Sequence, residues 1–221
     1  MRDIDTLVAF ATAHLAPIAD KSGRILYSGS HTLRVGSIYL LGLNPGGDPT
    51  THDDTVGSSL AELSSRKNNA YLDESWEYRG KPYPIGQSPL QIRVCWLLER
   101  LGTAPRDVCA SNIIFTRSKG SSGSGYPETA ELCWPVHEQI IRIVRPKVIV
   151  AFGNSGVSPY RFLRKQLHGT NETSIESGHG CWACSTFVGL SGIRVVGLPH
   201  LSRYAVINNP RVADWVKDIA L

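Results

Sequence analysis

The sequence predicts an α/β protein with three layers, in which helices cover both faces of a central, mainly parallel sheet. Short apolar segments alternate along the chain with amphipathic segments of helical periodicity, and this alternation is typical of parallel strands joined by helices. The apolar segments at 36–43, 108–115 and 147–152 have no polar face, as expected for strands that are buried on both sides.

The other elements follow from residue spacing and from the residues at the segment ends. Helices are expected at 3–16, near 57–66, and at 88–101, 129–144, 157–167 and 210–220, and two short strands within 183–198. The helix at 88–101 has clear ends, because Ser88 is a good N-cap, Pro89 suits the first helical position and a glycine follows the last turn. Residues 47–86 form a polar insertion. No linker divides the chain, so we expect one domain over residues 1–221.

Composition argues against a membrane protein. The chain of 221 residues is 42% hydrophobic and 19% charged, which is ordinary for a soluble globular protein. No stretch approaches the roughly 18 consecutive apolar residues of a membrane span. The N-terminus carries acidic residues and helical periodicity instead of the basic start and apolar run of a signal peptide. We therefore expect a cytoplasmic monomer with no membrane partner.

The number and spacing of the cysteines predict that they are free thiols, and we expect no metal and no other cofactor. Their number is odd, and a disulfide framework is unusual in a cytoplasmic chain. Cys181 and Cys184 form a CxxC pair with His179 nearby, but a zinc site would need a second matching pair. We expect these two cysteines to pack in or beside the hairpin at the end of the chain. The five cysteines are Cys95, Cys109, Cys133, Cys181 and Cys184.

Polar residues or glycines stand where the predicted parallel strands end. Asn44 follows the first strand, Asn112 lies within the second, Gly153-Asn154 follows the third and His200 follows the last. Open α/β sheets bind ligands outside the carboxyl ends of their strands. The sequence therefore predicts that these side chains share one pocket.

The same segments resemble the uracil-DNA glycosylase superfamily. GLNPG at 42–46 is similar to the Gly-x-Asn-Pro-Gly motif of its mismatch-specific and single-strand-selective branches. LPHLSR at 198–203 is similar to the second motif, His-Pro-Ser, with Leu201 in place of proline. SNIIFTR at 111–117 resembles the strand that recognises the base, and VIVAFGNSG at 148–156 resembles the strand followed by Gly-Asn. The four blocks keep the order of the family, whose fold the resemblance therefore implies.

The resemblance implies a role for each polar residue of the pocket. Asn44 would position the attacking water, and His200 would donate a hydrogen bond to the pyrimidine O2 as negative charge develops there. Asn112 would pair with the base edge, either with uracil or, with its amide rotated by 180°, with a cytosine-type edge. Base-pocket positions are expected at Gly42, Leu43 and an aromatic residue that stacks on the base, for which Tyr83 is chosen from Tyr71, Trp76, Tyr78 and Tyr83.

DNA is the expected partner, either as a duplex or as a single strand. The 23 basic and 19 acidic side chains give a net charge of +4, which suits a polyanion but does not identify one. Backbone amides, hydroxyls and basic groups would contact phosphates, and Arg203 or Tyr204 would enter the base stack. These positions are Gly46, Gly47, Ser118, Lys119, Ser202, Arg203 and Tyr204, with Arg117, Ser121 and Ser122 as further candidates.

The function expected from these observations is a monofunctional DNA glycosylase that hydrolyses the N-glycosidic bond of a flipped-out uracil or modified pyrimidine. No lysine occupies a motif position, so a Schiff-base lyase step is not expected. The alternatives are a non-catalytic nucleic-acid-binding protein of the same fold, a hydrolase of free nucleosides or nucleotides, and a glycosylase dedicated to modified pyrimidines such as those of phage DNA.

Plain structural roles remain open for single motifs. Asn44-Pro45-Gly46 could be an ordinary turn, His200 a strand-end histidine satisfied by the backbone, and SKGSSGSG at 118–125 a solvated loop. The carboxylates that follow the first motif could assist the attacking water or simply belong to a loop; these are Asp48, Asp53 and Asp54.

Overall fold

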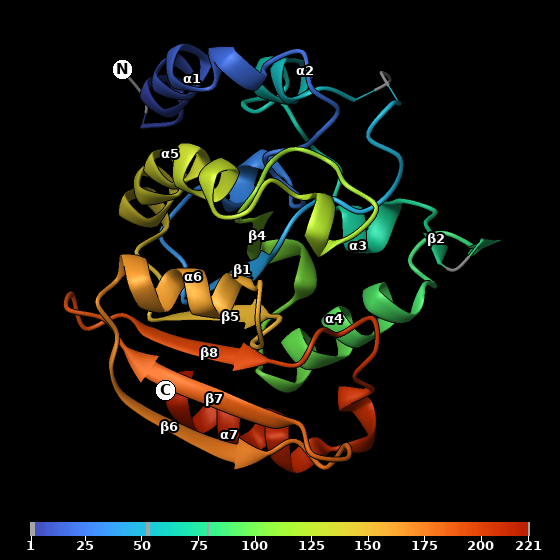
Figure 1. Cartoon of the computed structure of the whole chain (residues 1–221), viewed down its shortest axis with the longest axis vertical. Coiled ribbons are helices and arrows are strands. Elements are labelled where there is room, and N and C mark those ends of the chain that lie inside the picture. The colour runs from blue at the N-terminus through green and yellow to red at the C-terminus, as the bar shows by residue number, and fades with distance from the viewer. Residues whose placement is uncertain (1–2, 52–53, 79, 221) are drawn as a thin grey trace.

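The computed structural model, which describes residues 3–51, 54–78 and 80–220, is an α/β fold with a mainly parallel sheet (Figure 1). Within this part of the chain, the six strands of the sheet lie in the order β4 (Cys109–Asn112), β1 (Ile38–Gly42), β5 (Val148–Phe152), β8 (Arg194–Leu198), β7 (Ala183–Val188) and β6 (Thr170–Glu176). The first four strands run parallel to one another, whereas β7 and β6 are joined to them by antiparallel pairing. The predicted fold class is confirmed.

Helices cover both faces of the sheet and make the three predicted layers. One face carries α5 (Glu128–Val144) and α6 (Pro159–Gln166), with α1 (Asp3–His14) and α2 (Val56–Ala61) packed beside them. The other face carries α3 (Ala70–Asp73), α4 (Pro89–Arg100) and α7 (Pro210–Ala220). Shorter elements are the hairpin strands β2 (Glu77–Tyr78) and β3 (Lys81–Pro82) and the 3-10 turns Ala16–Ile18, Ser30–Thr32, Pro105–Asp107, Ser121–Gly123 and Val206–Asn208.

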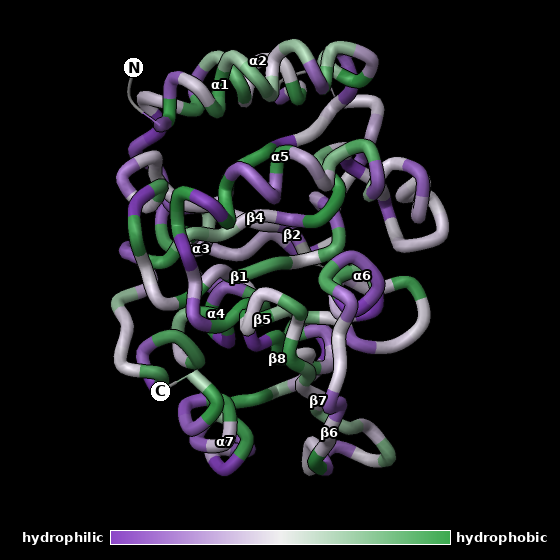
Figure 2. Tube along the Cα trace, turned by 90° about the vertical axis from the view of Figure 1, so that its left-hand side faces the viewer, coloured by the Kyte–Doolittle hydropathy of each residue, from purple (hydrophilic) through white to green (hydrophobic). Residues whose placement is uncertain are grey.

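Strand alternation divides the apolar residues between two cores. In β1, Tyr39 and Leu41 face the core under α5, while Ile38 and Leu40 face the core under α4. All five residues of β1 are buried, and the strand runs as a hydrophobic segment through the middle of the molecule (Figure 2). Burial on both faces is the reason why these strands read as continuous apolar runs in the sequence. No helix in the described part of the chain is long and apolar enough to cross a membrane.

The helix expected at 88–101 forms as α4, and its start has a capping box. The Ser88 side chain accepts a hydrogen bond from the Gln91 amide, while the Gln91 side chain accepts one from the Ser88 amide. The expected strand at 108–115 ends earlier, at Asn112, but the next residues still follow β1: the amides of Ile113 and Ile114 donate to the carbonyls of Gly42 and Leu43, at 2.9 and 2.8 Å.

Sequence patterns did not predict β6, the short helix α3 or the small hairpin. In β6, Thr170–Glu176, six of the seven residues are exposed, because this strand is the edge of the sheet. An edge strand that is exposed over most of its length carries no hydrophobic alternation. The opposite edge is partly covered: Leu26 and Gly23 form isolated antiparallel bridges with Ser111 and Thr116. This bridging segment brings Arg24 and Tyr27 to the end of β4.

His137 of α5 is buried in the core and carries no charge near neutral pH. Its Nε2–H donates to the Ile113 carbonyl at 3.2 Å, so Nδ1 is the acceptor for the Tyr39 hydroxyl at 2.9 Å. The ring also packs against Phe115, with 4.8 Å between centroids. Burial lowers the pKa of His137 to about 4, although carbonyl hydrogen bonds act in the opposite direction.

The stability of the protein should fall as the pH is lowered from 6.5 to 4. Between these values the unfolded histidine, with a pKa of 6.5, binds a proton that folded His137 does not bind. The stability advantage of wild type over His137→Gln should therefore shrink by roughly 3 kcal/mol across this window. Urea denaturation of both proteins at several pH values measures it. His168→Asn, which replaces an exposed histidine, is the control, and a pH-independent difference for His137→Gln would contradict the prediction.

Candidate functional site

A cleft of about 860 Å³ opens where the parallel strands end. It is lined by residues that leave each strand: Leu43 and Asn44 after β1, Asn112 at the end of β4, Gly153 after β5 and His200 after β8. This is the edge at which open parallel sheets bind ligands. The strand exits that the sequence suggested as one pocket therefore lie together.

The amide of Asn44 has a defined orientation. Its Nδ2 lies 2.7 Å from the Pro45 carbonyl oxygen, 2.9 Å from Ser118 Oγ and 3.4 Å from the Ser118 carbonyl oxygen. Carbonyl oxygens only accept hydrogen bonds, so the atom that faces them must be the NH₂ group. Asn44 Oδ1 makes no hydrogen bond to a described residue, and Asn44 lines the cleft. It therefore offers a ligand an acceptor that cannot ionise.

Hydrogen bonds join the turn after β1 to the segment after β4. The Ser118 amide donates to the Pro45 carbonyl at 3.0 Å, and the Ser118 hydroxyl donates to the Gly120 carbonyl at 2.8 Å. Arg117 Nη1 donates to the Gly46 carbonyl at 2.7 Å. Ser118 is only 4% exposed, so its hydroxyl serves Asn44 and Gly120 from inside the protein.

Asn112 lies beside Gly42, its partner in the pairing of β4 with β1. A Cβ atom on Gly42 would overlap Asn112 Oδ1 and would come within 2.7 Å of the Phe152 ring. Glycine at this position makes room for both side chains. The Asn112 amide also interacts with the hydroxyl of Tyr27. Burial raises the pKa of Tyr27, so the phenol stays neutral and can either donate or accept.

His200 presents a hydrogen-bond donor to the cleft. Its Nδ1 lies 3.2 Å from the backbone nitrogen of Ser202 and 2.7 Å from Ser202 Oγ. Because a backbone N–H can only donate, Nδ1 accepts and the neutral ring carries its proton on Nε2. His200 is exposed as a residue, but desolvation by the surrounding protein and the charge of Arg203 lower its pKa to about 4. The ring is therefore neutral at pH 7, and it stands edge-on to Phe152 with 5.5 Å between centroids.

Leu201 fixes the turn that carries His200. Its side chain is fully buried in the core under α4, and its carbonyl accepts a hydrogen bond from Arg93 Nη1 at 2.7 Å. Where the resembled motif has proline, this chain thus anchors the turn by packing instead of by a restricted φ angle.

Aromatic residues from two segments form another wall of the cleft. Tyr71 and Trp76 come from the polar insertion, and Tyr27 comes from the segment that bridges to β4. Their rings meet at angled contacts, with centroids 5.4 Å apart for Tyr71 and Trp76 and 6.2 Å apart for Tyr27 and Trp76. Tyr71 and Trp76 were candidates from the sequence. Tyr27 was missed, because the segment around it has no strand or motif pattern.

A charged network supports this aromatic wall. Arg24 donates to both oxygens of Glu74, at 2.8 and 2.7 Å, and to Asp54 at 2.6 Å, and its guanidinium lies 5.5 Å from the centroid of the Tyr27 ring. Glu74 also accepts from Trp76 Nε1 at 3.2 Å and from Arg66 at 3.0 Å. Burial favours the neutral form of Glu74, but the arginines outweigh it and lower its pKa, so the carboxylate is charged.

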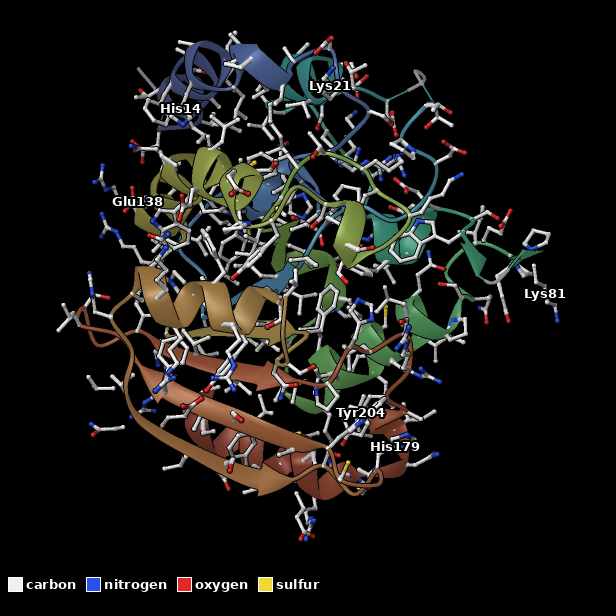
Figure 3. All side chains as sticks on the ribbon, viewed as in Figure 1. His14, Lys21, Lys81, Glu138, His179 and Tyr204 are labelled. Carbon is white, nitrogen blue, oxygen red and sulfur yellow. The ribbon has the colours of Figure 1, made fainter. Side chains whose placement is uncertain are left out.

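Most of the other sequence-predicted positions lie at the cleft. The residues Gly46, Gly47, Ser118, Lys119, Ser202 and Arg203 all line it. Among the described residues, the cleft lining does not include Gly42, Tyr83 or Tyr204. Gly42 lies directly behind Asn112, and Tyr83 follows β3, near Lys81 at the projecting end of the molecule (Figure 3). Tyr204 is buried and donates to the Ser177 carbonyl at 2.7 Å, so its ring is not available to enter a base stack.

The carboxylates after the first motif make local contacts. Asp48 accepts from the Thr50 amide and pairs with Lys119 at 3.0 Å; the backbone hydrogen bond to Thr50 is the main cause that lowers its pKa to about 2. Asp54 pairs with Arg24, and neither carboxylate lines the cleft. Asp53 and the side chain of Tyr78 lie outside the described residues.

The two cysteines of the CxxC pair have different surroundings. Cys184 is buried within β7, and Cys181 is exposed in the loop before it. Within the described ranges, no group of three or more His, Cys, Asp and Glu side chains could hold a metal ion.

Comparison of the sequence with models of known protein families and with curated protein sequences found no match. Function is therefore inferred from the cleft and from the motifs that line it.

Gly42→Ala should destabilise the protein and disturb Asn112. The added methyl group overlaps the Asn112 carboxamide and the Phe152 ring, and overpacking of this kind costs about 1–3 kcal/mol. Gly46→Ala is the matched control, because a Cβ atom there meets nothing within 4 Å. Chemical denaturation of both variants measures the difference. Equal stability of the two variants would show that the space behind Asn112 is not needed.

Proposed function

We propose that this protein is a monofunctional DNA glycosylase with the fold of the uracil-DNA glycosylase superfamily, acting on a flipped-out uracil or modified pyrimidine. One observation carries the proposal: an oriented acceptor, Asn44 Oδ1, and an oriented donor, His200 Nε2–H, face the same cleft as the amide of Asn112. A plain turn at Asn44 would need no side-chain acceptor left open toward a cavity.

The proposed reaction breaks the bond between C1′ of the deoxyribose and N1 of the base. Asn44 Oδ1 accepts a hydrogen bond from a water, whose lone pair then points at C1′. As the C–N bond breaks, its electron pair moves into the base and charge collects on O2, where His200 Nε2–H donates. The water oxygen bonds to C1′ and releases a proton to solvent. Oriented donors of this kind stabilise charge only as it develops, and so lower the barrier.

Asn112 would recognise the Watson–Crick edge of the base. The Tyr27 hydroxyl, its neighbour, can donate or accept, so either rotation of the Asn112 amide leaves that contact satisfied. Both uracil-type and cytosine-type edges therefore remain candidate substrates. Phe152 stands edge-on to His200, and its ring also lies beside Gly42, the pairing partner of Asn112.

DNA would approach along the rim of the cleft. Gly46 and Gly47 offer backbone without side chains, and Lys119, Ser202 and Arg203 add charge and a hydroxyl. Such contacts hold the phosphates without recognising sequence, while flipping of the nucleotide costs a few kcal/mol. We further propose that the protein works as a cytoplasmic monomer.

The wall contributed by the polar insertion favours a second candidate substrate. Glu74, Ser75 and Trp76 line the cleft, and its volume of about 860 Å³ leaves space beside an unmodified pyrimidine. A pyrimidine with a larger substituent, such as those found in phage DNA, is therefore part of the proposal.

Base release should be lost when the two oriented groups are removed. His200→Ala removes the donor at O2 and should lower kcat by roughly a hundredfold to a thousandfold. Asn44→Ala leaves the water unheld and should lower it by roughly a hundredfold. The measurement is release of base and formation of abasic sites from oligonucleotides that contain uracil, mismatched or modified pyrimidines, with His168→Asn as a surface control.

The same assay separates the proposal from its rivals. Tight DNA binding without an abasic product, unchanged in Asn44→Ala and His200→Ala, would identify a non-catalytic binding protein. Product from free nucleosides or nucleotides, but not from DNA, would identify a nucleoside hydrolase.

Ser118→Ala should slow the chemical step without weakening DNA binding. The variant loses the hydroxyl that accepts from Asn44 Nδ2 at 2.9 Å, and one lost hydrogen bond of about 1–1.5 kcal/mol corresponds to roughly a tenfold fall in kcat. KM should change little. Ser118→Thr keeps a hydroxyl and should restore kcat. A rise in KM with kcat unchanged would instead indicate that Ser118 contacts phosphate, as its position in the loop first suggested.

A further inference from the structure

The loop between β6 and β7, residues 177–182, presents an exposed tryptophan on a rigid turn. The Ser177 amide donates to the Trp182 carbonyl at 2.9 Å, and the Trp182 amide donates to the His179 carbonyl at 3.1 Å. Gly178 and Gly180 adopt positive φ angles of 75° and 54°, which close the turn tightly. Trp182 remains 36% exposed in this loop.

The two stems of this loop are tied to the wall of the cleft. On one side, the buried hydroxyl of Tyr204 donates to the Ser177 carbonyl at 2.7 Å, and Tyr204 directly follows the cleft residue Arg203. On the other side, Asn154 Nδ2 donates to the Ala183 carbonyl at 2.7 Å, and Asn154 directly follows the cleft residue Gly153. Hydrogen bonds therefore connect both stems of the loop to the turns that carry His200 and Gly153.

Aromatic rings pack against one another at the tip of the loop, at tilted and edge-on angles. The His179 ring lies against Trp182, with 4.6 Å between centroids, and also meets Tyr204 at 6.3 Å. His179 and Tyr204 lie together at the same end of the molecule (Figure 3). The core thus supports His179, His179 supports Trp182, and the outer surface of the indole faces solvent. An indole held in place in this way loses little conformational entropy when a flat partner stacks on it.

We propose that Trp182, backed by His179, is a stacking platform for an unpaired nucleobase next to the flipped nucleotide. The proposal rests on the function proposed above, because only a DNA strand in the cleft would bring such a base to this loop. A nucleotide has an apolar base face and a phosphate on either side, and two basic residues adjoin the stem at residues 176–177. Arg203 precedes Tyr204, whose hydroxyl donates to the Ser177 carbonyl, and Arg211 donates to the Glu176 carbonyl at 3.3 Å. Stacking on aromatic side chains is tolerant of sequence, which suits a platform outside the base pocket.

The platform also takes over a role that Tyr204 does not fill. Tyr204 is buried and its hydroxyl donates a hydrogen bond to the Ser177 carbonyl, so it supports the loop from the core. Trp182 is then the aromatic side chain that this support presents to a strand leaving the cleft.

Equilibrium binding tests the platform without depending on turnover. The probe is a short fluorescein-labelled single strand that carries one 2′-fluoro-2′-deoxyuridine, whose fluorine disfavours the oxocarbenium-like state and keeps the strand intact. Trp182→Ala should weaken binding by roughly 5-fold to 100-fold, the effect typical of one lost stacked base, and Trp182→Phe should recover most of it. Leu190→Ala is the matched control: Leu190 is 78% exposed at the other end of β7, and its replacement should leave binding unchanged.

A disulfide trap on wild-type protein locates the stacked base directly. All five cysteines lie in the described part of the chain, and of these Cys181, beside Trp182, is the exposed one. Oligonucleotides with a mixed disulfide tethered to a single base should exchange with the Cys181 thiol, releasing the small thiol, when that base adjoins the target nucleotide, and should fail when it lies far along the strand. Cys181→Ser should abolish the crosslink.

The outcomes separate this inference from the proposed function. If wild type binds the strand and Trp182→Ala binds equally well, or if the crosslink ignores position, the platform is overturned while the glycosylase proposal stands. A protein partner at Trp182 would give that same unchanged binding. If wild type neither binds DNA nor releases a base, both proposals fail together.

Discussion

Parallel pairing of β1 with β4 and β5 is the constraint on which the candidate site depends. Gly42 pairs with Asn112, and the continuation of the sheet pairs Phe152 with Leu198. Because β4, β1, β5 and β8 run in one direction, the segments that follow these strands all leave the sheet at the same edge. A one-residue slip of β4 would turn Asn112 to the other face of the sheet. Register, more than any single contact, therefore assembles the cleft.

The polar groups at this edge are oriented by partners that can only donate or only accept a hydrogen bond. Asn44 faces carbonyl oxygens with its NH₂ group, and His200 faces a backbone N–H with its Nδ1. Neither side chain can reverse without placing two donors or two acceptors against each other and losing the hydrogen bonds that orient it. The cleft is thus preorganised: one acceptor and one donor point toward a ligand before any ligand arrives.

The sequence predicted the central fold well because burial leaves a strong pattern. Strands such as Val148–Phe152 are apolar throughout, and the start of α4 is marked by Ser88 and Pro89. Motif residues at strand exits could be grouped by the parallel-sheet rule alone. The elements that escaped prediction have no periodic pattern. They are the exposed edge strand β6 and the segment of Tyr27, which isolated β-bridges hold beside β4. The burial of Tyr204 also depends on a tertiary contact, with Ser177, that local spacing does not encode.

The geometry of the cleft allows a uracil-type or a cytosine-type base edge, and the charge states of Asn44 and His200 help to choose between them. Asn44 cannot ionise, and His200 is neutral above its lowered pKa of about 4, so neither can hand a full proton to a departing base. Under the proposed function the base must then leave as an anion that a neutral donor stabilises. A uracil-type ring spreads this charge over two carbonyl oxygens, whereas a cytosine-type ring has one carbonyl and leaves less readily unless it is protonated. Although Tyr27 lets Asn112 accommodate either edge, the chemistry at His200 favours the uracil type, or a modified pyrimidine whose substituent withdraws electrons.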